Sequence, residues 1–127
     1  MTDYEPGDPT ALAPGMLLDA AGLELEHEPL GASQIVSGSP TVATHVLDER
    51  DGREVGVWEM NPGTATDTEI DEVFLVIAGR ATVVFDEVPD GSSPEPAELA
   101  PGVVVRLTAG MRTTWTVHET LRKIYIA

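Results

Sequence analysis

The sequence predicts one all-β domain, a barrel or sandwich of antiparallel strands. Short runs rich in Val, Thr, Ile and Leu recur from Thr41 to the end of the chain, at the spacing of about eight to twelve residues that is typical of such folds. Gly, Pro or Asp-Gly signals separate these runs. The chain has 127 residues, of which 42% are hydrophobic, so it is long enough for one core and too short for two.

The first forty residues are expected to form an N-terminal arm (1–40) before the main domain (41–127). Residues 1–13 carry three acids and two prolines without periodicity and predict a loose tail. The segment Met16–Gly22 predicts one or two helical turns that end at a glycine cap. In Leu23–Glu26 apolar and acidic residues alternate, which predicts an edge strand.

Eight strands are expected in the main domain. Asp51-Gly52 predicts a tight turn after the first strand, Gly79-Arg80 a short connection between the third and fourth, and residues 89–96 the longest loop of this half. No repeat or linker divides the domain. The expected strands are Thr41–Leu47, Glu54–Met60, Val73–Ala78, Ala81–Asp86, Ala97–Leu99, Val103–Leu107, Arg112–Val117 and Leu121–Ile126.

The charge balance excludes several classes of partner. The chain has 22 acidic and 7 basic residues and a formal net charge of −15. Such a surface repels phosphate backbones and anionic lipid, so neither nucleic acid nor a membrane is expected as a partner. There is no cysteine, which excludes disulfides and thiolate chemistry. Together with an N-terminus unlike a signal peptide, this predicts a cytoplasmic protein.

The order of these pieces resembles the cupins, small barrels of the jelly-roll type. Their first motif is G-x5-H-x-H-x3–4-E-x6-G; Glu72 and Gly79 keep its E-x6-G spacing, and Gly63 lies upstream of them. Their second motif is G-x5-P-x-G-x2-H-x3-N, whose two glycines match Gly102 and Gly110. The resemblance implies a jelly-roll β-barrel of two antiparallel sheets.

A closer resemblance is to the small cupins that include ureidoglycine aminohydrolase and the ethanolamine-utilisation cupins. It covers roughly residues 40–127 and rests on Trp58–Gly63, Asp71-Glu72, Trp115–Val117 and Arg122–Tyr125. Related cupins often pair, so the resemblance implies a homodimer. The apolar residues of the arm are candidates for crossing to the partner subunit, namely Leu23, Leu25, Leu30 and Ile35.

The ligand positions of the family's metal site are altered in this chain. Counting back from Glu72 places Thr68 and Thr66 where the two histidines stand, and counting from Gly110 places Thr113 at the third. Divalent transition metals need nitrogen donors to bind tightly, and a threonine hydroxyl is a poor substitute. We therefore expect no metal and no other cofactor.

Strand alternation sets which neighbours of Glu72 share its side of the sheet. If Glu72 points into the barrel, Thr66 and Thr68 do so too, whereas Asp67 and Glu69, like Asp71, face outward. Outward acids would form a solvated rim. A bulge that turned one of them inward is the alternative, and an all-oxygen site would then suit Mg²⁺ or Ca²⁺.

Glu72 itself has two interpretations. In the structural one it pairs with a base such as Arg112 or Lys123, or accepts hydrogen bonds from Thr68 and Thr113. In the catalytic one, apolar walls raise its pKa and make it a proton donor or acceptor for a bound small molecule.

The aromatic residues and the histidines allow further expectations. Trp58, Phe74, Trp115 and Tyr125 either pack the core or line a ligand cavity, and the two roles are compatible. No two histidines have ligand spacing, so each is expected at the surface or in a pairing role. The three histidines are His27, His45 and His118.

The sequence therefore favours a metal-free cupin that binds a small organic ligand in its barrel. The alternative is a small-molecule enzyme, either through metal-free acid–base chemistry at Glu72 or through a metal-dependent reaction like those of aminohydrolases or dioxygenases. The candidate ligand-binding residues are Trp58, Thr66, Thr68, Glu72, Phe74, Thr113, Trp115 and Tyr125.

Overall fold

The computed structural model describes residues 12–127, and in that range it contains nine β-strands and no helix. All of the strand pairs are antiparallel, which confirms the predicted all-β class. The strands are β1 (Glu28–Pro29), β2 (Ile35–Ser37), β3 (Thr41–Arg50), β4 (Arg53–Met60), β5 (Gly63–Thr68), β6 (Glu72–Glu87), β7 (Ala97–Leu99), β8 (Val104–Leu107) and β9 (Arg112–Ile126).

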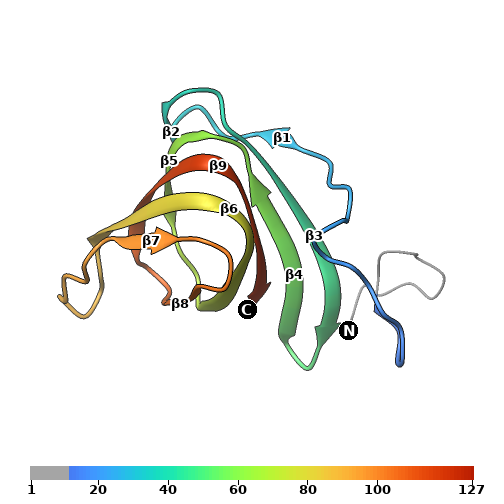
Figure 1. The fold of residues 1–127 in the computed structure, drawn as a ribbon. Helices are drawn as coiled ribbons and strands as arrows, with labels where there is room; N and C mark the ends of the chain where they lie inside the picture. The colour runs from blue at the N-terminus through green and yellow to red at the C-terminus, as the bar shows by residue number, and fades with distance from the viewer. Residues whose placement is uncertain (1–11) are drawn as a thin grey trace.

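The strands curl around a common interior. One wall has the order β1-β3-β4-β9-β5-β2, and β6 pairs with β7, β8 and β9 to form the other wall. Figure 1 shows β3 and β4 along one side, β6 with β7 and β8 on the other, and β9 curving between them. Because β9 pairs with β4, β5 and β6, the hydrogen-bonded ladder continues from one wall to the other.

Two of the expected connections are wrong. Val73–Ala78 and Ala81–Asp86 do not form a hairpin at Gly79-Arg80, because β6 runs through this point as one strand of 16 residues. Likewise β9 continues from Arg112 to Ile126 without the break expected after Val117. The register of β6 against β9 shifts three times between Val76 and Ala81, so Gly79 marks a bulged bend and not a turn.

The arm also differs from the expectation. Met16–Gly22 forms turns but no helix, and Leu23–Glu26 is not a strand. The Arg122 guanidinium explains this, since its Nη1 donates to the carbonyl oxygens of Ala20, Ala21 and Leu23 at 2.9, 3.2 and 2.7 Å. These carbonyls are therefore held by a side chain of β9 and do not take part in a helix or a ladder. Most of the predicted tail, residues 1–11, lies outside the described residues.

Two short strands of the arm join the barrel of their own chain. β1 pairs with β3, and β2 pairs with β5, where Ile35 stands opposite Ala65. Leu30 lines the cavity described below. Two of the four apolar arm residues considered for a partner subunit, Leu30 and Ile35, are thus used within one chain.

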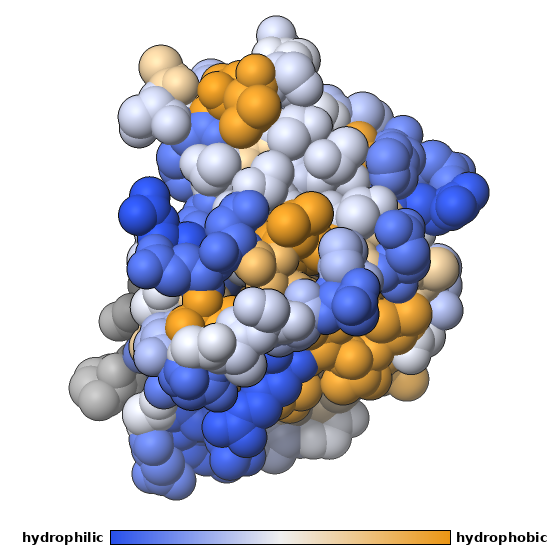
Figure 2. All heavy atoms as spheres, turned by 90° about the vertical axis from the view of Figure 1, so that its left-hand side faces the viewer, coloured by the Kyte–Doolittle hydropathy of each residue, from blue (hydrophilic) through white to orange (hydrophobic). Residues whose placement is uncertain are grey.

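A large buried apolar cluster lies inside the barrel, and the outer surface is mixed. Among the described residues, Phe74, Val76, Leu121 and Trp115 lie in one buried cluster. Figure 2 shows, on the side of the molecule that carries β7, a largely polar surface with separate apolar areas. No helix in the described part of the chain is long and apolar enough to cross a membrane.

Candidate functional site

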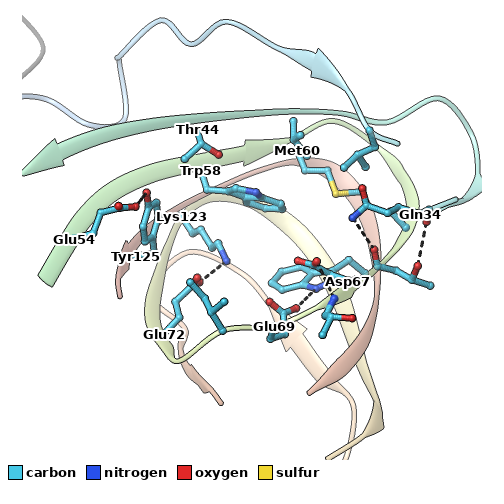
Figure 3. A pocket seen from close by; sticks show the side chains of 17 residues that line it. Gln34, Thr44, Glu54, Trp58, Met60, Asp67, Glu69, Glu72, Lys123 and Tyr125 are labelled. Carbon is cyan, nitrogen blue, oxygen red and sulfur yellow. Dashed lines mark hydrogen bonds and ion pairs between the residues drawn. The ribbon is translucent and has the colours of Figure 1, made fainter. Parts of the chain in front are cut away.

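A cavity of about 340 Å³ opens into the barrel between the two walls. Figure 3 shows Glu54, Trp58, Glu72, Lys123 and Tyr125 on one side of this space and Gln34, Met60, Asp67 and Glu69 on the other. The structure brings six of the eight sequence-predicted ligand-binding residues to its lining: Trp58, Thr66, Thr68, Glu72, Trp115 and Tyr125. The other two, Phe74 and Thr113, are 1% exposed and lie in the layer behind the lining.

A buried ion pair lies in one wall of the cavity. Lys123 Nζ donates to Glu72 Oε2 at 2.6 Å, and the two side chains are only 5% and 10% exposed. The ammonium also lies over the rings of three aromatic residues, at 4.7, 4.2 and 4.9 Å from their centroids. These residues are Trp58, Phe74 and Trp115. Lys123 is therefore fixed as a positive charge in an aromatic surrounding.

This pair decides how Glu72 is held. Of the two bases considered as its partner, Lys123 is confirmed, whereas Arg112 lies 3.9 Å from Glu87 instead. The alternative partner Thr113 does not bond to Glu72, because Thr113 Oγ1 donates to Glu69. Glu72 is therefore paired with a base, as its structural interpretation predicts. It also lines the cavity.

Glu69 lies inside the barrel, which contradicts the expected outward orientation. Its side chain is buried, and its Oε2 accepts hydrogen bonds from Thr113 Oγ1 at 2.6 Å and from Trp115 Nε1 at 3.0 Å. The backbone holds the residue in place, since Glu69 N donates to the carbonyl of Met111 at 2.8 Å. Neutral donors therefore orient this carboxylate toward the cavity that it lines.

The strand parity assumed from the sequence is wrong on β5. Asp67 stands opposite Thr113, as Ala65 stands opposite Trp115, and residues that oppose each other share a face of the sheet. Ala65, Asp67 and Glu69 therefore continue one inward series, while Glu72 begins another on β6. The turn between Thr68 and Glu72 puts the alternation counted back from Glu72 out of step by one residue. Asp67 and Glu69 therefore point inward and do not form an outer rim.

Thr66 and Thr68 line the cavity from the alternate face of β5. Thr66 Oγ1 donates to the carbonyl of Gln34 at 3.4 Å. The family motif allows four residues before its glutamate as well as three. Counting four places Ala65 and Asp67, and not the two threonines, at the histidine positions, and this is the count that the structure supports.

These side chains do not fit the metal cage of the cupin motif. Neither count supplies an imidazole, and Thr113 stands at the third histidine position. Of the inward acids, Glu72 is paired with Lys123 and Glu69 accepts from Thr113 and Trp115. Within residues 12–127 no three His, Cys, Asp or Glu side chains are grouped to hold a metal ion.

Asp67 is the inward acid whose titration is most altered. Its carboxylate reaches solvent at the edge of the cavity, yet the walls remove enough water to raise its pKa to about 6. The negative charges of Glu69 and Glu72 raise this pKa further, whereas the Thr68 amide and Lys123 oppose the shift. Sequence reasoning missed this residue because the assumed parity placed it outside.

We expect Asp67→Asn to remove a fall in stability between about pH 4 and pH 6. The folded state binds the Asp67 proton more tightly than the unfolded state does, because the folded pKa is the higher one. Stability therefore decreases as pH rises through this window, and the full penalty is present above it. Urea midpoints from pH 4 to pH 7.5 measure the effect, and Asp86→Asn, an exposed acid on β6, is the control. An unchanged pH profile in Asp67→Asn would show that Asp67 is not desolvated.

Tyr125 and Glu54 close one end of the cavity. Tyr125 Oη donates to Glu54 Oε2 at 2.6 Å. Burial of the phenol and the neighbouring Glu54 raise the pKa of Tyr125 above its ordinary value, so the hydroxyl stays protonated as a donor. Gly56, opposite Tyr125 on β4, leaves room for the ring, because a Cβ there would lie 2.4 Å from the Tyr125 hydroxyl.

The histidines lie away from the cavity lining. His27 contacts Glu59 Oε2 at 2.6 Å and Thr41 Oγ1 at 2.8 Å on the outer side of the barrel. The His118 ring lies 3.2 Å from the Thr82 hydroxyl in exposed surroundings. His45 is part of the β3 ladder. The pairing or surface roles expected for His27 and His118 are confirmed.

Comparisons with known proteins agree with this architecture. A protein of unknown function of the DUF861 family from Pseudomonas syringae has a TM-score of 0.68 at 25% identity; the match covers 86% of this chain but only 46% of that protein's chain. The EutQ protein of Clostridium difficile has a TM-score of 0.61 at 20% identity and coverage of 87% and 83%. A cupin superfamily protein from Desulfitobacterium hafniense has a TM-score of 0.61 at 14% identity and coverage of 93% and 94%.

The family assignment rests on the sequence itself. No curated protein matches the chain. The model of the EutQ-like cupin domain matches residues 47–125, which is more than half of the chain and includes β4 to β8 and most of β9. The structural neighbours at 14–20% identity support the same fold. This protein belongs to the EutQ-like cupin domain family.

Proposed function

We propose that this cupin binds a small organic molecule in the cavity of its barrel. The observation that carries the proposal is the cavity itself, which has about 340 Å³ of space, apolar and aromatic walls, and a few fixed polar groups. Ligand sites of proteins commonly have about 300–1,000 Å³ and this composition. Trp58, Met60 and Trp115 supply the apolar walls, and Glu54, Asp67 and Glu69 supply polar atoms.

The polar groups are held in place before any ligand arrives. Glu69 is fixed by Thr113 and Trp115, and Glu54 by the Tyr125 hydroxyl. A ligand that meets fixed groups loses less free energy to side-chain ordering, so preorganisation favours binding.

Blocking the cavity tests the proposal. Thr44 is exposed, lines the cavity and stands opposite Trp58, so Thr44→Trp places an indole in the opening without disturbing the buried core. We expect ligand-observed NMR with a fragment library to detect binders whose signals are lost in Thr44→Trp. Thr120→Trp, on an exposed part of β9 outside the lining, is the matched control. Equal binding by Thr44→Trp and the unaltered protein would place the ligand elsewhere and reject the proposal.

Acid–base catalysis is a second candidate function, favoured by the carboxyl groups in the cavity and by the raised pKa of Asp67. Proton abstraction from a bound metabolite would be seen by NMR as deuterium incorporation at carbon in D2O. Loss of incorporation in Glu72→Gln with an intact fold would assign Glu72 a catalytic role. Incorporation that continues in both Glu72→Gln and Asp67→Asn would exclude these two residues as the proton carriers.

The absence of a metal is part of the proposal. The residues at the family's ligand positions are Ala65 or Thr66, Asp67 or Thr68, Glu72 and Thr113, and none of them supplies an imidazole. We expect elemental analysis of protein purified without chelator to find only substoichiometric Mn, Fe, Ni and Zn. One equivalent of any of these metals would instead support the metal-dependent alternative.

Oligomeric state and location complete the proposal. The family resemblance suggests a homodimer, and the lack of cysteine suggests a cytoplasmic protein. Size-exclusion chromatography with light scattering is expected to give twice the chain mass at micromolar concentration. A mass of one chain would reject the dimer.

A further inference from the structure

We infer that the cavity selects organic molecules that carry a positive charge, and that this charge lies beside Asp67 and Glu69. The inference rests on the proposed function and specifies its ligand class. It begins with the charges in the cavity lining, which includes four carboxylates and one ammonium group. The carboxylates are those of Glu54, Asp67, Glu69 and Glu72, and the ammonium is that of Lys123.

The one ammonium is already used. Lys123 Nζ lies 2.6 Å from Glu72 and within 5 Å of three ring centroids, so it neutralises Glu72 and is enclosed by aromatic groups. No other Lys or Arg lines the cavity in the described part of the chain. Three acids therefore face this space without a cation of their own.

The partners of these acids do not cancel their charge. Glu69 accepts from the Thr113 hydroxyl and the Trp115 indole, and Glu54 accepts from the Tyr125 hydroxyl. Asp67 accepts from the backbone amide of Thr68 at 2.9 Å. All of these donors are neutral. Loss of water around the Asp67 carboxyl raises its pKa, and the negative charges of Glu69 and Glu72 raise it further. A cationic ligand would relieve this repulsion.

The walls indicate which kind of cation fits. Trp58 and Trp115 line the cavity with apolar ring surface, and their attraction for cations is already used by Lys123 Nζ, 4.7 and 4.9 Å from the two ring centroids. Leu30, Val42 and Met60 add aliphatic surface. This lining suits an ammonium group with alkyl substituents, whereas a bare metal ion would gain nothing from it. The net charge of −15 further favours the approach of cations.

A matched pair of probes tests the inference. Choline and 3,3-dimethylbutan-1-ol have the same shape, but a carbon replaces the charged nitrogen in the alcohol. By isothermal titration calorimetry at pH 7.5 and low salt, we expect choline to bind at least about tenfold more tightly than the alcohol. Asp67→Asn should weaken choline binding about tenfold and leave binding of the alcohol unchanged. Asp86→Asn, which alters an exposed acid outside the cavity, should change neither.

Three outcomes would overturn the inference. Equal binding of the two probes would show that charge does not matter. Choline binding that is unchanged in Asp67→Asn would place the cation elsewhere. Failure of both probes to bind at millimolar concentration would reject the ligand class. None of these results decides whether the cavity binds other small molecules, which the Thr44→Trp comparison measures separately.

Discussion

Replacement of Lys123 by methionine is expected to lower the free energy of unfolding by about 3–5 kcal/mol. The Glu72 side chain, 10% exposed, would remain in the barrel wall without its partner at 2.6 Å, and desolvation of an uncompensated carboxylate is costly. The three rings around the ammonium would also lose their cation. Urea unfolding followed by tryptophan fluorescence measures the change, since Trp58 and Trp115 both contact the site.

The double variant Lys123→Met/Glu72→Leu separates pairing from packing. Replacement of both charges by apolar groups of similar size removes the buried charge, so its stability should return close to that of the unaltered protein. Glu72→Gln alone should cost a few kcal/mol, because it removes the partner of Lys123 instead. A loss below about 1 kcal/mol in Lys123→Met, the range of exposed ion pairs, would contradict the buried-pair interpretation.

Gly79→Ala is expected to lower the free energy of unfolding by about 4 kcal/mol or more, or to prevent folding. Gly79 has a φ of 89°, and a Cβ there would lie 2.0 Å from the Thr120 carbonyl oxygen and 2.7 Å from the Leu121 Cα. The neighbouring atoms are backbone atoms of β9, so they cannot move aside as the end of a flexible side chain would. The bend that brings β6 across β9 depends on this close approach.

Gly52→Ala is the matched control for Gly79→Ala. Gly52 also has a positive φ, 76°, but nothing lies within 4 Å of its ideal Cβ position. This substitution should cost only about 1 kcal/mol, the strain of the left-handed backbone alone. Chemical denaturation of both variants separates strain from steric overlap. Similar losses in the two would show that β9 adapts to a side chain at position 79.

The sequence predicted which residues surround the cavity better than it predicted their orientation. Trp58, Trp115 and Tyr125 were expected as possible walls of a ligand cavity, and they line it. Lys123 was considered as a partner of Glu72 and is confirmed. Asp67 and Glu69 were placed outside, because an alternation carried unbroken from Glu72 back to Thr66 ignores the turn at residues 69–71. One added residue puts Asp67 and Glu69 on the inward side, while Thr66 and Thr68 also reach the cavity lining.

Glycine positions show a similar limit. Gly52 follows Asp51 in the tight turn that Asp-Gly predicts between β3 and β4. Gly79 was expected to be a turn as well, but the structure places it within β6 at a bulge. The local sequence indicates that a position needs a positive φ. It does not indicate whether the chain then reverses direction in a hairpin turn or continues as the same strand beyond a bulge.

The amino-acid sequence by itself determined the all-β class, the cupin resemblance, the excess of acids and the loss of imidazoles from the family's ligand positions. These properties depend on composition and on short-range order, which can be counted along the chain. Only the tertiary structure decided that Asp67 and Glu69 face inward and that Lys123 neutralises Glu72. These facts depend on the strand register and on a turn of three residues. Both are set by pairing with β9, which lies more than forty residues away in the sequence from β5.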